Sequence, residues 1–256
     1  MIQGLEKFRD FFKGFEDHYT LIGGVACELN LDEAGIDFRV TKDLDLVLAA
    51  EVMTPEFVQR FWEFVKEGGY QVKQKSSGAK QFYRFSEPQN SEYPVMLELF
   101  SRAIDGVVLE ADATLTPIPM DDDISSLSAI LLDESYYRCL QDGRVLIDGV
   151  AVLSAEYIIP FKMRAYQDLR LRREQHGEGD AKHISKHKND VFRMVQLLSP
   201  QQRVNLPEEI KEHMRGFIEA MQSESIDLKN LGLRGMTVDT VLDVFQQVYG
   251  LNEDKQ

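Results

Sequence analysis

The chain has 256 residues, 43% of them hydrophobic, so it can bury a sizeable core as one large domain or two modest ones. Its formal net charge of −14 argues against a protein that coats nucleic acid with its whole surface, although a local basic cleft is compatible with that charge. No run approaches the roughly 18 apolar residues of a membrane helix, and the charged N-terminus is unlike a signal peptide. Cys27 and Cys139 form no CxxC pair, which indicates neither a disulfide framework nor a cysteine zinc site. We therefore expect a cytoplasmic protein without a membrane partner.

The first half of the chain predicts a mixed sheet flanked by helices. Apolar residues at helical spacing indicate a helix over residues 4–17, and a short buried strand "YTLI" then runs into Gly23 and Gly24 before a helix "VACELNL". Thr54, Pro55 and a pair of glycines are the start and stop signals of a helix over 54–69. The other strands are expected at 43–48, 70–74, 81–86, 93–101 and 106–115.

The second half is mainly helical. After a helix over 126–141, an Asp-Gly pair between two apolar runs predicts a β-hairpin over 144–154. Long helices are expected at 154–174, 180–198, 207–222 and 237–249. The pattern predicts an α+β fold, with an α/β core domain over 1–123 and a mainly helical domain, including the small hairpin, over 124–256.

Two aspartates one residue apart interrupt an apolar strand, "DLDLVL". Side chains alternate along a strand, so Asp43 and Asp45 share one face while Leu44 and Leu46 point into the core. Two neighbouring carboxylates repel each other, and a strand disfavours aspartate, so a compensating cation is expected. Hard oxygen ligands suit Mg²⁺, which usually takes its remaining ligands from water and substrate phosphates. An exposed face of an edge strand is the alternative for such a pair.

The glycine pair and a third acid extend this pattern. Gly23 and Gly24 stand between a strand and a helix, where a phosphate can approach backbone N–H groups at the helix N-terminus. The sequence has neither the GxGxxG nor the GxxxxGK[ST] fingerprint at this point. Glu98 lies in the apolar run "PVMLELF", where a charge is costly without a partner, so it is the candidate third carboxylate of a metal site.

These motifs resemble a known family. "IGG", followed after a helix by "RVTKDLD", resembles the nucleotidyltransferase superfamily with the DNA polymerase beta fold, and most closely the abortive-infection toxins of the AbiEii type. The later "FKMRAYQDLRLRR" and "GDAKHISKHKNDVFRM" segments are similar to the helical half of that family, so the resemblance covers roughly residues 19–198. Many members have serine at the second glycine position, and Gly24 departs from that pattern.

The resemblance implies specific roles and partners. It implies that Gly23, Gly24, Thr41 and Lys162 contact a nucleoside triphosphate, and that Asp43, Asp45 and Glu98 bind Mg²⁺. It also implies a toxin-antitoxin context, with RNA such as a tRNA end as the acceptor and an antitoxin protein as a partner.

The helical half offers two further observations. Lys162 lies on the apolar stripe of its helix, so its amine either extends out to water or meets an anion. Residues 162–193 hold nine Lys or Arg against five Asp or Glu, a local reversal of the overall charge. That segment can meet a polyanion or form a solvated face. Asp190 resembles an acidic position of the family, but an ion pair with Lys186 or Arg193 explains it equally well.

The function that these patterns favour is a magnesium-dependent nucleotidyltransferase that moves a nucleoside monophosphate from a triphosphate to an acceptor hydroxyl and releases pyrophosphate. The alternatives are a transferase acting on a small molecule of the aminoglycoside kind and a nucleotide-binding protein that lacks turnover.

Overall fold

The computed structural model describes residues 2–39, 41, 43–48, 54–77, 80–102, 130–131, 133–177 and 180–252. The strand expected at 106–115 and the domain boundary expected after residue 123 lie outside these ranges. The chain folds into two compact units, Met1–Pro119 with Arg144–Ser154 and Met120–Gly143 with Ala155–Gln256.

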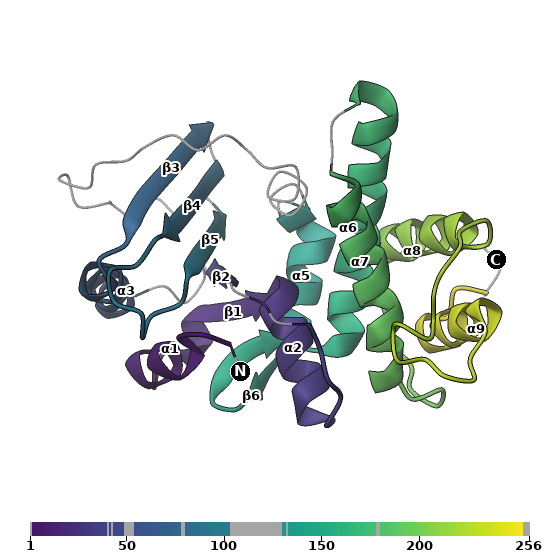
Figure 1. The fold of residues 1–256 in the computed structure, drawn as a ribbon, viewed down its shortest axis with the longest axis horizontal. Helices are drawn as coiled ribbons and strands as arrows, with labels where there is room; N and C mark the ends of the chain where they lie inside the picture. Colours follow the sequence, from purple (N-terminus) through teal and green to yellow (C-terminus); the bar gives the residue numbers. More distant parts are fainter. Residues whose placement is uncertain are drawn as a thin grey trace. The chain divides into compact units, whose positions relative to one another are not determined.

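A mixed sheet forms the centre of the first unit (Figure 1). Seven strands from the described part of the chain lie in the order β3-β4-β5-β2-β1-β7-β6. They are β1 (Tyr19–Ile22), β2 (Asp43–Leu48), β3 (Gln71–Ser77), β4 (Lys80–Ser86), β5 (Met96–Arg102), β6 (Arg144–Ile147) and β7 (Val150–Leu153). The pairs β2–β5 and β1–β7 are parallel and the other pairs are antiparallel. The expectation of an α+β fold with a mixed sheet is confirmed.

In the described part of the first unit, three helices flank this sheet. They are α1 (Leu5–Phe11), α2 (Gly23–Glu33) and α3 (Pro55–Gly68). Rings of Phe8, Phe12 and Phe64 lie 4.6 to 5.7 Å apart, so an aromatic cluster joins α1 to α3. The signals for α3 are confirmed: the Thr54 hydroxyl accepts the Phe57 N–H, and Gly69 ends the helix at φ 63°.

Two helix boundaries differ from the sequence prediction. The first helix ends at Phe11 rather than residue 17, and Gly14 takes φ 90°, a conformation that a helix cannot continue through. The second helix begins at Gly23, so both glycines form its first turn instead of preceding it.

The hairpin forms at the expected Asp-Gly pair but joins a different unit. Asp148 and Gly149 take φ values of 48° and 75°, as a tight two-residue turn requires. Strand β7 pairs in parallel with β1, which places the hairpin in the N-terminal sheet rather than with the helices. Every residue of β7 is buried, and a strand that is apolar on both faces needs the interior of a sheet.

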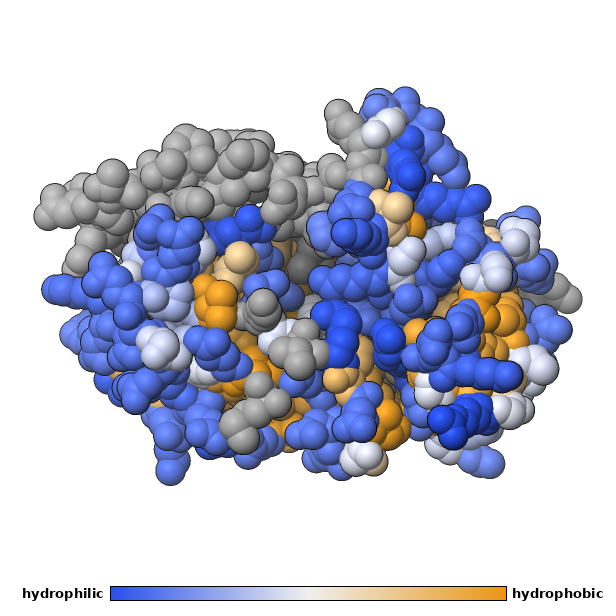
Figure 2. Space-filling model, in the orientation of Figure 1, coloured by the Kyte–Doolittle hydropathy of each residue, from blue (hydrophilic) through white to orange (hydrophobic). Residues whose placement is uncertain are grey.

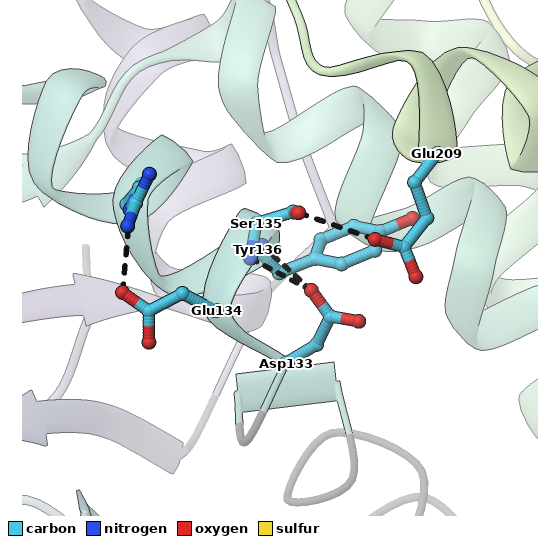
Figure 3. Close-up of polar contacts among 6 residues, drawn as sticks. Asp133, Glu134, Ser135, Tyr136 and Glu209 are labelled. Carbon is cyan, nitrogen blue, oxygen red and sulfur yellow. Dashed lines mark hydrogen bonds and ion pairs between the residues drawn. The ribbon is translucent and has the colours of Figure 1, made fainter.

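The described part of the second unit is helical. It contains α5 (Glu134–Asp142), α6 (Ala155–His176), α7 (Ala181–Met194), α8 (Glu208–Met221) and α9 (Val238–Tyr249). The last four agree with the expected helices within a few residues, whereas α5 begins at Glu134 and does not continue the expected helix over 126–141 back through Asp133. Asp133 caps α5, since its carboxylate accepts the backbone N–H groups of Ser135 and Tyr136 (Figure 3).

A proline inside α6 has a structural consequence. Pro160 has no N–H, so the carbonyl of Glu156 lacks its usual partner one turn later. The hydroxyl of Tyr249 donates to that carbonyl at 2.7 Å, which ties α9 to the start of α6.

The face drawn in Figure 2 is hydrophilic over most of its coloured area, with hydrophobic residues in smaller groups. Among the described helices, none combines the length and apolar character needed to cross a bilayer.

Candidate active site

Strand register brings two of the predicted carboxylates together. In the parallel pair β2–β5, Asp45 lies opposite Glu98, and Asp43 lies two residues earlier, opposite Met96. Leu44 and Leu46 are fully buried, so the two aspartates face the other side of the sheet, as predicted. The two carboxyl groups are close enough for Asp45 to raise the pKa of Glu98.

The same register continues across four strands. Arg84 on β4 lies opposite Glu98 on β5, Glu98 opposite Asp45 on β2, and Asp45 opposite Ile22 on β1. We call these four residues the cross-strand row. Gly23 follows Ile22 directly and opens α2, so the row ends at a helix N-terminus.

Contact with Asp45 explains why residue 23 is glycine. Gly23 takes φ 67°, which strains any residue with a Cβ, and a Cβ built there would overlap the Asp45 carboxylate. The first N–H groups of a helix have no intrahelical acceptor, and they carry the positive end of the helix dipole. The structure therefore places a carboxylate beside a turn that can bind an anion.

Gly24 is crowded by the segment that leads into β2. A Cβ on Gly24 would lie 2.7 Å from the Thr41 methyl carbon and 3.3 Å from Nη2 of Arg39. Thr41 is buried. Gly23, Gly24, Thr41, Asp45 and Glu98, all predicted from the sequence, thus lie in one neighbourhood, with Asp43 on the same strand face.

Arg84 is a member of this site that the sequence analysis missed. Its Nη2 and Nε atoms lie 2.6 and 2.8 Å from Oε1 of Glu98, and both side chains are largely buried. An arginine between a tyrosine and a phenylalanine in "FYRF" was the available signal, because a charge in an apolar strand needs a partner, as Glu98 does.

Opposing effects act on the Glu98 carboxyl group. Burial raises its pKa well above the usual range, and the neighbouring Asp45 carboxylate raises it further through charge repulsion and a hydrogen bond. Arg84 acts in the opposite direction and only partly offsets these effects. The Asp45–Glu98 pair is therefore short of positive charge, and a divalent cation would supply it.

The donor set fits a magnesium ion that is only partly enclosed by protein. Within the described ranges, no three His, Cys, Asp or Glu side chains form a ready metal cage. Mg²⁺ commonly binds through one or two carboxylates and completes its octahedron with water and substrate phosphates, which suits the carboxylates of Asp43 and Asp45.

Lys162 belongs to the second unit and has an acidic partner there. Its Nζ lies 3.1 Å from Oδ2 of Asp190, and both side chains are buried. Arg193 lies 3.6 Å from the other carboxylate oxygen of Asp190. Lys162 thus meets an anion instead of extending to water, and that anion is a side chain of the same unit.

Comparisons with known proteins add little to this geometry. No family model and no curated protein matches the chain. A solved structure described as an antigenic nucleotidyltransferase-like protein from Paracoccidioides brasiliensis is similar over 90% of this chain and 94% of that one, with 16% identity and a TM-score of 0.40. A similarity at that level carries no argument about fold or function.

Proposed function

We propose that the protein is a magnesium-dependent nucleotidyltransferase. The observation that supports this proposal best is the end of the cross-strand row, where the Asp45–Glu98 pair meets the first turn of α2 at Gly23. Carboxylates attract the metal and helix N–H groups attract phosphate, so the two features together suit a magnesium-bound polyphosphate.

In the proposed reaction, the oxygen of an acceptor hydroxyl attacks the α-phosphorus of the triphosphate. A new phosphorus–oxygen bond forms, the bond to the β-phosphate bridge breaks, and pyrophosphate leaves with that electron pair. Magnesium supplies charge neutralisation on the phosphates and lowers the pKa of the attacking hydroxyl.

The residues of the chain have distinct proposed roles. Asp43 and Asp45 hold the metal, while the N–H groups that begin at Gly23 and Gly24 bind phosphate oxygens. Glu98 is suited to accept the hydroxyl proton, because burial raises the pKa of its carboxyl group and so makes the carboxylate a stronger base than an ordinary glutamate. Arg84 orients Glu98 through its two contacts to Oε1. The motif resemblance also implies that Lys162 contacts the triphosphate. We keep this role as a proposal, since the ion pair of Lys162 with Asp190 gives it no support.

The acceptor is proposed from the motif resemblance. RNA is the first candidate, with an antitoxin protein as the matching partner, and a small hydroxylated molecule is the second. Arg172, Arg173 and Lys182 on α6 and α7 are basic residues that a polyanion could contact. A steep fall of affinity with salt would favour RNA, because phosphate contacts release counterions.

Triphosphate binding provides the test of the proposed function. We expect calorimetry to show ATP or another triphosphate binding to the wild-type protein only with Mg²⁺. The isosteric double variant Asp43→Asn/Asp45→Asn should lose this binding by at least about tenfold, since it removes two charges from the cation. Asp37→Asn, an exposed aspartate of the same unit, is the matched control. Equal binding and equal pyrophosphate release by the double variant and the control would reject the proposal.

One observation favours a second candidate, a nucleotide-binding protein without turnover. Arg84 already supplies part of the positive charge at Glu98, so the site is partly compensated without metal. Magnesium-dependent binding without pyrophosphate release in the presence of RNA and small-molecule acceptors would select this candidate.

A further inference from the structure

Glu28 makes two contacts to one residue beside the candidate phosphate site. Its Oε2 accepts the backbone N–H of Thr41 at 3.1 Å and the Thr41 hydroxyl at 2.6 Å. The two residues are 13 positions apart, and Glu28 lies on α2 whereas Thr41 leads into β2. These two bonds, which we call the Glu28–Thr41 clamp, therefore tie the helix to the segment that carries the aspartates.

The clamp lies on the face of α2 that contains Gly24. Residues four apart lie on one helix face, so Glu28 stands one turn above Gly24 and Thr41 fits between them. The Thr41 methyl packs where a Gly24 side chain would be, at 2.7 Å from an added Cβ. Glycine at position 24 is the consequence of this close approach.

The clamp also determines whether the Thr41 hydroxyl and the nearby Arg39 guanidinium can contact a ligand. The single proton of the Thr41 hydroxyl is donated to Glu28, so it is not donated to a phosphate while the clamp is closed. Two residues earlier, the Arg39 guanidinium lies beside Gly24, with Nη2 3.3 Å from the added Cβ. A guanidinium and a helix N-terminus at the same place both attract an anion.

We propose that Glu28 is a positioning residue that holds Thr41, and through it the Arg39 guanidinium, over the first turn of α2, so that the guanidinium meets the bound triphosphate. The inference deepens the proposed function and rests on it. It gives Thr41 a supporting role and assigns Arg39 the contact with a phosphate oxygen.

Kinetics of matched variants provide the first test. Glu28→Gln keeps the shape but weakens the acceptor, and we expect the KM for the magnesium triphosphate to rise on the order of tenfold with a smaller change in kcat. Glu33→Gln, an exposed glutamate of the same helix, should leave KM unchanged. Thr41→Ser keeps both donors and should stay within about twofold of wild type, whereas Thr41→Val should resemble Glu28→Gln.

A double variant separates positioning through Thr41 from a direct effect. If Glu28 acts through Thr41, the combination Glu28→Gln/Thr41→Val should raise KM no further than the worse single variant. Additive effects would overturn the inference. Should Glu28→Gln fail to fold, the comparison of Thr41→Val with Thr41→Ser carries the same test.

The backbone amide proton of Thr41 reports the clamp without any ligand. In NMR spectra we expect its resonance to move upfield in Glu28→Gln and to stay in place in Glu33→Gln, since only the first change weakens its acceptor. An unmoved resonance, or a moved resonance with an unchanged KM, would overturn the inference while the proposed function stands. A wild-type protein that binds no magnesium triphosphate would instead defeat the proposed function, and the role of Glu28 with it.

Discussion

Gly23 is the residue on which the geometry of the candidate site depends most directly. Its φ of 67° and its contact with the Asp45 carboxylate impose separate demands, and glycine meets both. Gly35 has a similar φ of 70° but nothing within 4 Å of an added Cβ. Alanine substitutions at the two glycines therefore separate the cost of backbone strain from the cost of the contact with Asp45.

We predict that Gly35→Ala costs about 1 to 2 kcal/mol of unfolding free energy, the strain of a left-handed alanine. Gly23→Ala should cost roughly 1 to 3 kcal/mol more, because the methyl group displaces Asp45. Urea unfolding monitored by circular dichroism measures both values. Equal costs for the two variants would show that Asp45 does not press against Gly23.

The residues of the site were predictable to different degrees. Asp43, Asp45, Gly23 and Gly24 stand out because charges and glycines in an apolar run need a reason. Arg84 and Glu28 were missed, since their roles arise from β4–β5 pairing and from a loop that folds back on α2. Contacts of this kind join positions 13 or 14 residues apart, and a pattern of neighbouring residues in the sequence does not predict them.

At the scale of elements, the start of α5 offers a test in which adjacent acids have different roles (Figure 3). Asp133 accepts two backbone N–H groups at 2.8 and 3.2 Å. Glu134 makes an exposed pair with Arg138 at 3.2 Å. We predict that Asp133→Ala lowers the unfolding free energy by about 1 kcal/mol and that Glu134→Ala lowers it by about 0.5 kcal/mol or less. Thermal or urea unfolding of the two variants checks the order, and a larger loss for Glu134→Ala would contradict the capping role.

The contact between α5 and α8 should depend on pH. The Tyr136 hydroxyl lies 3.1 Å from Nδ1 of His213, and the two rings are stacked. Burial lowers the pKa of His213 below 6.5, and the positive charge of Arg164 lowers it further, while Glu209, Asp168 and Asp133 oppose this.

The sign of the pH effect follows from proton binding. As pH falls below 6.5, the unfolded chain takes up the histidine proton before the folded protein does, so folding stability is lost. We predict that His213→Gln removes a slope of at most about 1.4 kcal/mol per pH unit from the wild-type curve. Urea unfolding at a series of pH values below 6.5 measures the slope. Equal slopes of unfolding free energy against pH for the wild type and the variant would contradict the prediction.

The hairpin shows where element-level prediction succeeds and where it stops. Its Asp148–Gly149 turn was predictable because two residues of this kind set a tight turn locally. The strand that the hairpin pairs with was not predictable, because the pairing of β7 with β1 joins Leu21 to Val152 across more than half the chain. The fully apolar β7 was the one local sign of a buried position.

At the scale of the whole molecule, the first unit is built from two separate stretches of sequence. A chain that ends at residue 123, the boundary expected from the sequence, would lack β6 and β7 and leave one edge of β1 unpaired. We predict that this fragment does not unfold cooperatively in urea. Joining residues 144–154 to residue 119 through a Gly/Ser linker should restore a cooperative transition. Cooperative unfolding of both fragments with equal midpoints would contradict the assignment of the hairpin to this sheet.

The central claim is that Asp43 and Asp45, beside the first turn of α2, hold a magnesium-bound triphosphate. Crystals grown with Mn²⁺ and a non-hydrolysable ATP analogue test it most directly, because manganese gives an anomalous signal at its own position. We predict a peak at bonding distance from a carboxylate oxygen of Asp43 or Asp45, with phosphate oxygens against the N–H groups that follow Gly23. A metal and nucleotide bound elsewhere, or no binding at millimolar concentration, would contradict the account.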